Sequence, residues 1–415
     1  MYLTPEEERM YAGEEGPGVQ AAMELLVTLG EFYGAPRLIK IVSAHASART
    51  YKHGKEYKTQ WMQDLADGGA RFRVLTTVNP GQVDFERWKE MGLPEDLPEK
   101  QREADAPFIK LGVIPVGTCL PYLHGNLPRF GEHFSWGGSS GQIFANSELG
   151  ARGNRDGAPL VVASAITGRT PEYGLHLDEN RKGQVLIDTS QLDFDKITRG
   201  DYAALGYYLG CTLLDKVLVF PNLPRDISQE ELRALTAGMP AGGAITLIHV
   251  VGVTPEAPTI EAAFGGKSPE ERLSITLTEI RKGYQMLTKA NTDIVDAVVF
   301  GCPHCSLPFV ARIAGMLEGK KVNSGVRLWL ATSKHIQTLA RQMGIMDIIE
   351  RAGGLILADV CLGPGASFDL LEGIKTVATS DSRGAHYIPN MCKVGLIFGD
   401  VSDCINAAIS GRWRG

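Results

Sequence analysis

Three of the seven cysteines in the sequence come directly after segments that have the composition of buried β-strands. In open parallel sheets, ligands bind at the carboxyl ends of the strands, so these three thiols are predicted to meet at one face of the fold. Three thiolates without a fourth suit a cubane iron-sulfur cluster with one open iron, and such an iron is a Lewis acid that can bind a substrate hydroxyl and carboxylate. The cysteines and their preceding segments are Cys119 after residues 113–116, Cys302 after residues 298–301 and Cys361 after residues 357–360.

The same residues allow other interpretations. Each cysteine taken singly could be a buried core thiol, because free cysteine is among the most buried residue types. The segment Cys302-Pro303-His304-Cys305 is also the C-x-x-C pattern of thiol-disulfide exchange proteins, which would make this a metal-free redox protein using Cys302 and Cys305. A zinc site is a third possibility, but the sequence has no second C-x-x-C at finger-like spacing. Three separate strand ends favour the iron site, and the same thiols could hold a four-iron, two-iron or single-iron centre.

Three polar segments could bind an anionic substrate, and the first two of them follow predicted strands. Residues 45–55 gather hydroxyls, two imidazoles and three cations, which suit carboxylate or phosphate oxygens, although a solvated basic loop fits equally well. Residues 379–387 supply Arg383 with hydroxyl neighbours, and a polar turn is the alternative there. The run at residues 137–141, Gly-Gly-Ser-Ser-Gly, could surround an anion with backbone N–H groups or form a tight turn.

Short apolar strands alternate with helical stretches along most of the chain, which predicts an α/β fold with mainly parallel sheets. Residues 94–106 are charged and carry two prolines, so they are predicted to form a surface loop. Helices are predicted to start at capping signals at Thr4, Ser228 and Ser268, the last of them running through Leu287. A further helix is predicted through residues 21–29, and the predicted strands cover residues 38–42, 216–220, 245–251, 295–300, 326–331, 356–360, 376–379 and 394–398.

The composition excludes several classes of partner. The chain has 415 residues, is 44% hydrophobic and carries a formal net charge of −6 with its cations scattered, so neither nucleic acid nor an anionic membrane is an expected partner. Its acidic start lacks a signal-peptide pattern, and no apolar run approaches the roughly 18 residues of a membrane span. We expect a cytoplasmic protein, where cysteines serve metal binding or catalysis more often than disulfides.

Taken together, these residues resemble the aconitase X family in its large-subunit form. The resemblance implies an aconitase-like multi-domain arrangement of α/β domains around an iron site, with the three cysteines as metal ligands. We divide the chain into residues 1–205, 206–295 and 296–415, the last part carrying two of those cysteines. The segments that carry the likeness are residues 3–7, 45–47 with Tyr51, 117–119, 144–147, 149–152, 167–171, 301–304, 358–361 and 385–387.

The resemblance also implies a reaction. Members of the family dehydrate either 5-phosphomevalonate, in an archaeal mevalonate route, or cis-3-hydroxy-L-proline. They use a small swivelling domain, fused or separate, that supplies a serine base; the chain ends at Gly415 without room for it, so a separate small subunit is the expected partner. The favoured prediction is an iron-sulfur hydro-lyase, with a 4Fe-4S cluster, that converts (R)-5-phosphomevalonate to trans-anhydromevalonate 5-phosphate.

This prediction assigns roles to polar residues and meets three departures from the family pattern. Gly138 stands where the family more often has glutamate, Gly153 where threonine is usual, and Arg383 where lysine is frequent. The assigned residues are His45, Ser47 and Asn146 as donors to charge building on the carboxylate, Arg49, Lys52 and Arg383 as cations for a phosphate, and Ser139, Ser140 and His386 as further substrate contacts.

Overall fold

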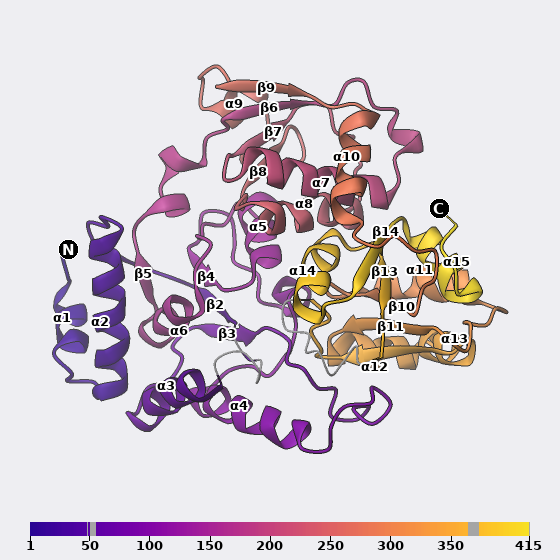
Figure 1. Cartoon of the computed structure of the whole chain (residues 1–415). Helices are drawn as coiled ribbons and strands as arrows, with labels where there is room; N and C mark the ends of the chain where they lie inside the picture. Colours follow the sequence, from indigo (N-terminus) through magenta and orange to yellow (C-terminus); the bar gives the residue numbers. More distant parts are fainter. Residues whose placement is uncertain (48, 50–54, 364–372, 415) are drawn as a thin grey trace.

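The computed structural model describes residues 1–47, 49, 55–363 and 373–414, and three parallel sheets dominate it (Figure 1). The largest sheet has five parallel strands in the order β12-β11-β10-β13-β14. Successive residues of its strands point to opposite faces, so Val298 and Val299 of β10 enter two different hydrophobic clusters. The strands are β10 (Ala297–Phe300), β11 (Arg327–Thr332), β12 (Gly354–Ala358), β13 (Thr376–Thr379) and β14 (Gly395–Phe398).

Helices cover both faces of this five-stranded sheet, as is usual for parallel sheets. Apolar residues of α10 (Leu277–Leu287) and α14 (Ser382–Cys392) join the cluster on one face. The other face is packed by α11 (Leu307–Leu317), α13 (Ile345–Ala352) and α15 (Val401–Ser410), with α12 (Lys334–Gln342) beside them.

A second parallel sheet has the order β8-β7-β6-β9 and lies at the top of Figure 1. Its apolar side shares one continuous cluster with the five-stranded sheet through α7 and α8, so these two parts of the chain have a common core. The elements are β6 (Val185–Asp188), β7 (Leu218–Phe220), β8 (Ile248–Val250), β9 (Glu271–Ser274), α7 (Arg199–Leu213), α8 (Gln229–Gly242) and α9 (Ile260–Phe264).

The N-terminal part contains a three-stranded parallel sheet, β3-β2-β4, and an antiparallel pair, β1-β5. Its own hydrophobic cluster joins α2 and α6 to β2 and the neighbouring helices. In the described residues, no helix is both long and apolar enough to cross a lipid bilayer. The elements are α1 (Pro5–Tyr11), α2 (Pro17–Phe32), β1 (Leu38–Lys40), β2 (Ser43–Ala46), α3 (Lys55–Asp67), β3 (Leu75–Val78), α4 (Leu97–Leu111), β4 (Phe134–Trp136), α5 (Ser139–Ser147), α6 (Ala158–Thr167) and β5 (Arg169–Pro171).

The predicted α/β class with mainly parallel sheets is confirmed, and so are the capping boxes at Thr4 and Ser228. Three local predictions are wrong. Residues 94–106 are not a loop, because α4 begins at Leu97 with a proline in its first turn, where a missing N–H costs nothing. The predicted helix from Ser268 is instead the edge strand β9 followed by α10, which has its own capping box at Thr276 and Glu279. Residues 113–116 form no strand, and only Gly117 makes an isolated bridge, to Val78.

Candidate functional site

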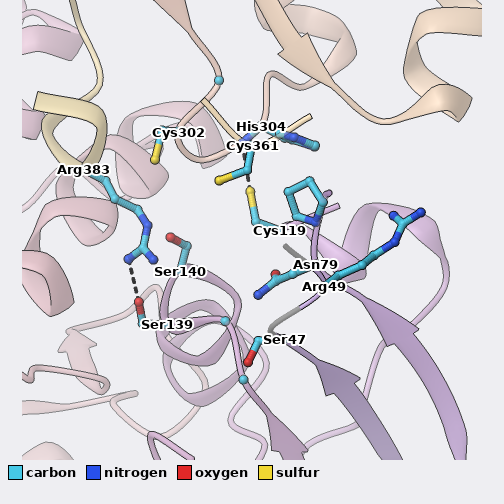
Figure 2. Close-up of a pocket in the computed structure, with 14 residues that line it drawn as sticks. Ser47, Arg49, Asn79, Cys119, Ser139, Ser140, Cys302, His304, Cys361 and Arg383 are labelled. Atoms are coloured by element: carbon cyan, nitrogen blue, oxygen red, sulfur yellow. Dashed lines mark hydrogen bonds between the residues drawn. The ribbon is translucent and has the colours of Figure 1, made fainter. Parts of the chain in front are cut away.

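A cavity of about 240 Å³ lies where the carboxyl ends of two parallel sheets converge (Figure 2). One wall consists of segments that follow β2, β3 and β4, and the other consists of segments that follow β10, β12 and β13. This is the place where open parallel sheets bind ligands. The lining residues are Ser47, Arg49, Asn79, Pro80, Cys119, Gly137, Gly138, Ser139, Ser140, Gly301, Cys302, His304, Cys361 and Arg383.

Cys119 reaches the cavity on a segment tied to the end of β3. The Thr118 N–H donates to the Val78 carbonyl oxygen at 3.1 Å, next to the bridge between Val78 and Gly117. The His304 backbone N–H donates to Cys119 Sγ at 3.1 Å, although it belongs to the loop after β10. The Cys119 sulfur is therefore held between the N-terminal sheet and the five-stranded sheet.

Cys302 and Cys361 come from two strands of the five-stranded sheet. Gly301 has a φ of 121°, and a Cβ there would lie 2.4 Å from the Ala331 carbonyl oxygen, so only glycine fits at this turn before Cys302. The Cys361 N–H donates to the Gly81 carbonyl oxygen at 2.9 Å, which ties the loop after β12 to the segment after β3. Figure 2 shows the three sulfur atoms turned toward one space.

Burial opposes ionisation of two of these thiols. Burial, with a smaller contribution from the neighbouring Cys361, raises the pKa of Cys119 to about 12, against the opposing effects of the His304 N–H and the Arg383 guanidinium. The pKa of Cys302 is also raised, chiefly by burial. Thiolates at this place need a nearby positive charge, and a metal centre supplies one. Within the described ranges, no three His, Cys, Asp or Glu side chains stand at the separations of a single-ion site.

The first turn of α5 and the first turn of α14 meet at the cavity. Arg383 Nη1 donates to Ser139 Oγ at 2.6 Å (Figure 2), and Ser139 and Ser140 are both buried. The N-terminus of α5 carries the positive end of the helix dipole and free N–H groups. The glycine-serine run predicted to surround an anion is therefore the start of a helix, which serves the same purpose.

Arg49 brings a second guanidinium to the cavity wall. Asp105 of α4 accepts from Arg49 Nε at 2.6 Å and from Nη2 at 2.7 Å, and the Arg49 side chain is 10% exposed. The third nitrogen, Nη1, is buried and has no hydrogen-bond partner in the part of the chain that the structure describes. Among the described lining residues there is no aspartate or glutamate, and the two lining cations are Arg383 and Arg49, the latter paired with Asp105 behind the wall.

His45 lies beneath the cavity and acts on a residue that lines it. Its Nδ1 is 2.8 Å from Thr77 Oγ1 and its Nε2 is 2.8 Å from Asn79 Oδ1. Burial lowers the pKa of His45 to about 4, so the ring is neutral, and the Asn79 oxygen can only accept. Nε2 therefore donates to Asn79, and the Asn79 amide group remains as a donor beside Ser47.

The structure brings most of the predicted polar residues to the cavity, namely Ser47, Arg49, Ser139, Ser140 and Arg383, but leaves others elsewhere. The Asn146 Nδ2 group donates to the carbonyl oxygens of Gly153, at 2.8 Å, and Thr246, at 3.0 Å, so this amide supports the backbone. His386 Nδ1 lies 2.9 Å from the Tyr207 hydroxyl, away from the lining. Lys52 lies outside the described residues.

Cys305, the second cysteine of the C-x-x-C motif, does not line the cavity. It is 3% exposed and packs in a hydrophobic cluster with Phe300 and Phe309. Burial raises its pKa well above the usual value. The two cysteines of the motif therefore lie in different surroundings, one in the core and one at the cavity.

Asn79 and His304 are cavity residues that sequence reasoning missed. Asn79 directly follows β3, so the strand-end rule that selected the cysteines would also have selected it. His304 lies within a motif already singled out, but its ring Nε2 donates to the Val360 carbonyl oxygen at 2.9 Å and its backbone N–H contacts Cys119. Such contacts between distant segments have no signal in a single sequence.

Comparison with known proteins agrees with this geometry. Models of the first, second and third domains of aconitase X match residues 1–179, 183–285 and 295–410. The phosphomevalonate dehydratase large subunit of Methanocaldococcus jannaschii is 40% identical over 98% of this chain and 99% of its own length. The cis-3-hydroxy-L-proline dehydratase of Pseudomonas aeruginosa is 32% identical over 98% of this chain and 70% of its own length.

A solved structure has the same fold over nearly the whole chain. The crystal structure of Thermococcus kodakaraensis aconitase X in its holo form gives a TM-score of 0.88 at 37% identity, and the match covers 98% of this chain and 100% of that chain. Full-length identity of this order, together with the three matched domains, establishes the relationship. The chain therefore belongs to the aconitase X family and is a dehydratase, an enzyme of the hydro-lyase class.

Proposed function

We propose that this chain is the large, catalytic subunit of an enzyme that dehydrates (R)-5-phosphomevalonate to trans-anhydromevalonate 5-phosphate. The observation that carries the proposal is the meeting of three thiols, from three distant segments, in a cavity that two guanidinium groups also line. Relatives from several archaea, among them the M. jannaschii protein, are named phosphomevalonate dehydratase large subunits. Their names support the substrate, and the charged wall supports it independently.

Cys119, Cys302 and Cys361 are the residues that would hold an iron-sulfur cluster, which we take to be a 4Fe-4S centre. The raised thiol pKa values of Cys119 and Cys302 fit a bound cationic group, and the His304 N–H bond to Cys119 Sγ would stabilise a thiolate. When bound, an iron that lacks a cysteine ligand would supply a Lewis acid for the substrate carboxylate and its leaving hydroxyl.

The charges of the cavity favour one of the two substrates known in the family. 5-Phosphomevalonate carries a carboxylate and a phosphate, which can each pair with a cation. cis-3-Hydroxy-L-proline carries one carboxylate and one ammonium, and the ammonium would lie near Arg49 or Arg383 with no acidic residue among the described lining residues to balance it. We therefore favour the phosphorylated substrate.

The polar lining residues bind and orient this substrate in the proposed reaction. Ser47 and the amide of Asn79, which His45 holds in place, donate to the carboxylate while negative charge builds on it. Arg383 and the N-terminus of α5 form one anion site, and Arg49 forms another on the other side of the sulfur atoms in Figure 2. The reaction removes a proton next to the carboxylate and expels the hydroxyl as water, leaving a carbon–carbon double bond.

A separate small subunit completes the proposed enzyme. The archaeal relatives are named large subunits, whereas the chain covers only 70% of the P. aeruginosa relative's length. We assign the proton-abstracting base to a serine of that small subunit, because the histidine of the described lining, His304, is a weak base. Burial lowers its pKa to about 4, and its Nε2 donates to the Val360 carbonyl oxygen.

The proposal is tested by anaerobic reconstitution of the two-subunit enzyme, followed by iron counting and by mass spectrometry of both substrates. Cys119→Ser and Cys361→Ser should each abolish bound iron and water loss. Cys404→Ser is the matched control, because Cys404 is a fully buried core thiol that does not line the cavity. Iron and activity that survive the loss of Cys119 would overturn the proposal, and loss of function only in Cys305→Ser would favour thiol-disulfide chemistry instead.

A further inference from the structure

Asp381 is a buried carboxylate that does not line the cavity but holds the backbone of the loop carrying Cys302. Its Oδ2 accepts from the Gly301 N–H at 2.7 Å and from the Cys302 N–H at 3.1 Å. The residue is 3% exposed. Hydrogen bonds to a carboxylate are stronger than bonds between neutral groups, so this pair of bonds fixes the turn at which β10 delivers its thiol.

The other oxygen of Asp381 is paired with an arginine from a different part of the fold. Arg199 Nη2 donates to Asp381 Oδ1 at 3.1 Å, and Arg199 Nη1 donates to Ser380 Oγ at 3.1 Å. The guanidinium also lies over the ring of Phe309, 4.4 Å from its centre. Because Arg199 is the first residue of α7, this contact joins the second sheet region to the carboxyl ends of β10 and β13.

Asp381 also lies next to the substrate-binding side of the cavity. It directly precedes α14, whose second residue is Arg383, and the Ala385 N–H donates to its carbonyl oxygen at 2.8 Å. The segment at residues 381–383 therefore does two things. The Asp381 side chain binds the Cys302 turn, and Arg383, in the first turn of α14, lines the cavity. A shift of this segment would move the thiol and the guanidinium relative to each other.

We propose that Asp381, held by Arg199, is a positioning residue that sets the place of the Cys302 thiol and its distance from Arg383. The inference rests on the proposed function, in which Cys302 binds iron. Gly301 gives the turn no side chain to restrain it, and the two N–H bonds to Asp381 restrain it directly at Gly301 and Cys302. Outer groups that orient metal ligands influence metal affinity almost as strongly as some ligands do.

The chain offers a closely matched control at the opposite edge of the same strands. Asp296 Oδ2 accepts from the Lys375 N–H at 2.9 Å and from the Thr376 N–H at 2.8 Å. It therefore makes the same kind of double bond to backbone, but at the amino ends of β10 and β13, away from the cysteines. Asp296→Asn therefore measures how much the loss of such a carboxylate lowers the stability of the fold, without an effect on the cysteines.

The experiment compares Asp381→Asn with Asp296→Asn in the anaerobic two-subunit enzyme. We expect Asp381→Asn to weaken iron binding by roughly 10- to 100-fold, the usual effect of losing an outer-shell partner. In the iron-free protein, Cys302 should also react faster with iodoacetamide, measured by peptide mass spectrometry with the partly exposed Cys211 as the internal reference. Asp296→Asn should lower the unfolding temperature but change neither iron affinity nor Cys302 reactivity.

Arg199→Lys provides a milder second variant in case Asp381→Asn does not fold. It keeps the charge but loses the planar fork that contacts both Asp381 and Ser380, so smaller changes in the same direction are expected. Wild-type iron affinity and Cys302 reactivity in both folded variants would overturn the inference. Failure of the wild-type protein to bind iron would instead overturn the proposed function. In that case the iron-free proteins still test the inference: equal Cys302 reactivity in the wild type and Asp381→Asn would show that Asp381 does not position the thiol.

Discussion

Arg49 illustrates how single residues prepare this cavity for an anion. Two of its nitrogens are fixed by Asp105, and Gln101 in turn donates to the Arg49 carbonyl oxygen at 2.9 Å and to Asp105 Oδ1 at 2.8 Å. The conformational entropy of a long cationic side chain is thus lost on folding rather than on binding. The remaining nitrogen, Nη1, has no hydrogen-bond partner among the described residues, and it is the atom that we propose for the substrate anion.

Replacing Arg49 tests this role at the scale of one residue. Arg49→Gln should lower kcat/KM for the phosphorylated substrate by roughly 10- to 100-fold, because a hydrogen bond to a charged group contributes about 1.5–3 kcal/mol. Iron content should not change. Steady-state kinetics and iron counting on the same preparation measure both quantities.

Arg37 provides the control for Arg49. It also makes a two-point contact with a carboxylate, Glu172, at 2.7 and 2.8 Å, but on the protein surface. Arg37→Gln should leave kcat/KM unchanged. Equal kinetics in Arg49→Gln and the wild type would show that Arg49 only supports the fold.

Cavity residues that follow a predicted strand could be predicted from the sequence. Residues whose role depends on a contact between two strands could not. Predicted strand ends led to the three cysteines, Ser47 and Arg383, although the segment before Cys119 forms no strand and reaches the cavity through its bridge to Val78. The role of His45, however, depends on its pairing with Thr77 in parallel register, which places Asn79 within reach of its ring. Register between strands more than 30 residues apart cannot be read from one sequence, so His45 was predicted to touch substrate directly.

At the scale of whole elements, the close approach of α7 and α8 supports the position of Arg199. A Cβ built on Gly206 of α7 would lie 1.7 Å from the Leu235 carbonyl oxygen of α8, and one on Gly210 would lie 2.4 Å from the Met239 carbonyl oxygen. The two helices therefore touch backbone to backbone, and any larger residue must separate them.

Gly206→Ala should destabilise the protein in spite of the better helix propensity of alanine. Propensity alone favours alanine by about 1 kcal/mol, whereas overpacking in a well-packed core costs typically about 1–3 kcal/mol or more. Gly315→Ala in α11 is the control, since nothing lies within 4 Å of its added Cβ, and it should stabilise slightly. Urea unfolding of both variants measures the difference, and a stabilised Gly206→Ala would contradict the backbone contact.

The elements that sequence reasoning misplaced are those whose buried positions are not apolar. In α4, Gln101 and Asp105 occupy buried positions because they support Arg49, so the helical spacing of apolar residues is hidden. In β9, an edge strand, most side chains are exposed, and its charged start resembles the first turn of a helix. The buried polar residues of α4 and the exposed side chains of β9 therefore explain why neither element was predicted.

At the scale of the whole molecule, the cavity lies between two parts of the chain whose sheets pack in largely different cores, although a few residues of the N-terminal part, such as Leu97 and Ile143, join the core of the rest. The N-terminal sheet region has its own hydrophobic cluster, whereas the second sheet shares one with the five-stranded sheet. Cys119 comes from the first of these parts, while Cys302 and Cys361 come from the last. A metal centre bound by all three would therefore cross-link the molecule, although the domain boundaries that we drew remain a prediction.

Iron removal tests this cross-link. A ligand that binds only the folded state stabilises it by about 2.7 kcal/mol at a hundred times its dissociation constant, so the iron-loaded protein should unfold at a higher temperature than the iron-free protein. Cys119→Ser should remove that increment, because the thiol from the N-terminal part is lost, whereas Cys404→Ser should lower both unfolding temperatures and keep their difference. Anaerobic calorimetry of the loaded and chelated forms measures the increment. If Cys119→Ser retained it in full, the iron would be bound by the C-terminal part alone, and the cavity between the sheets would not be the metal site.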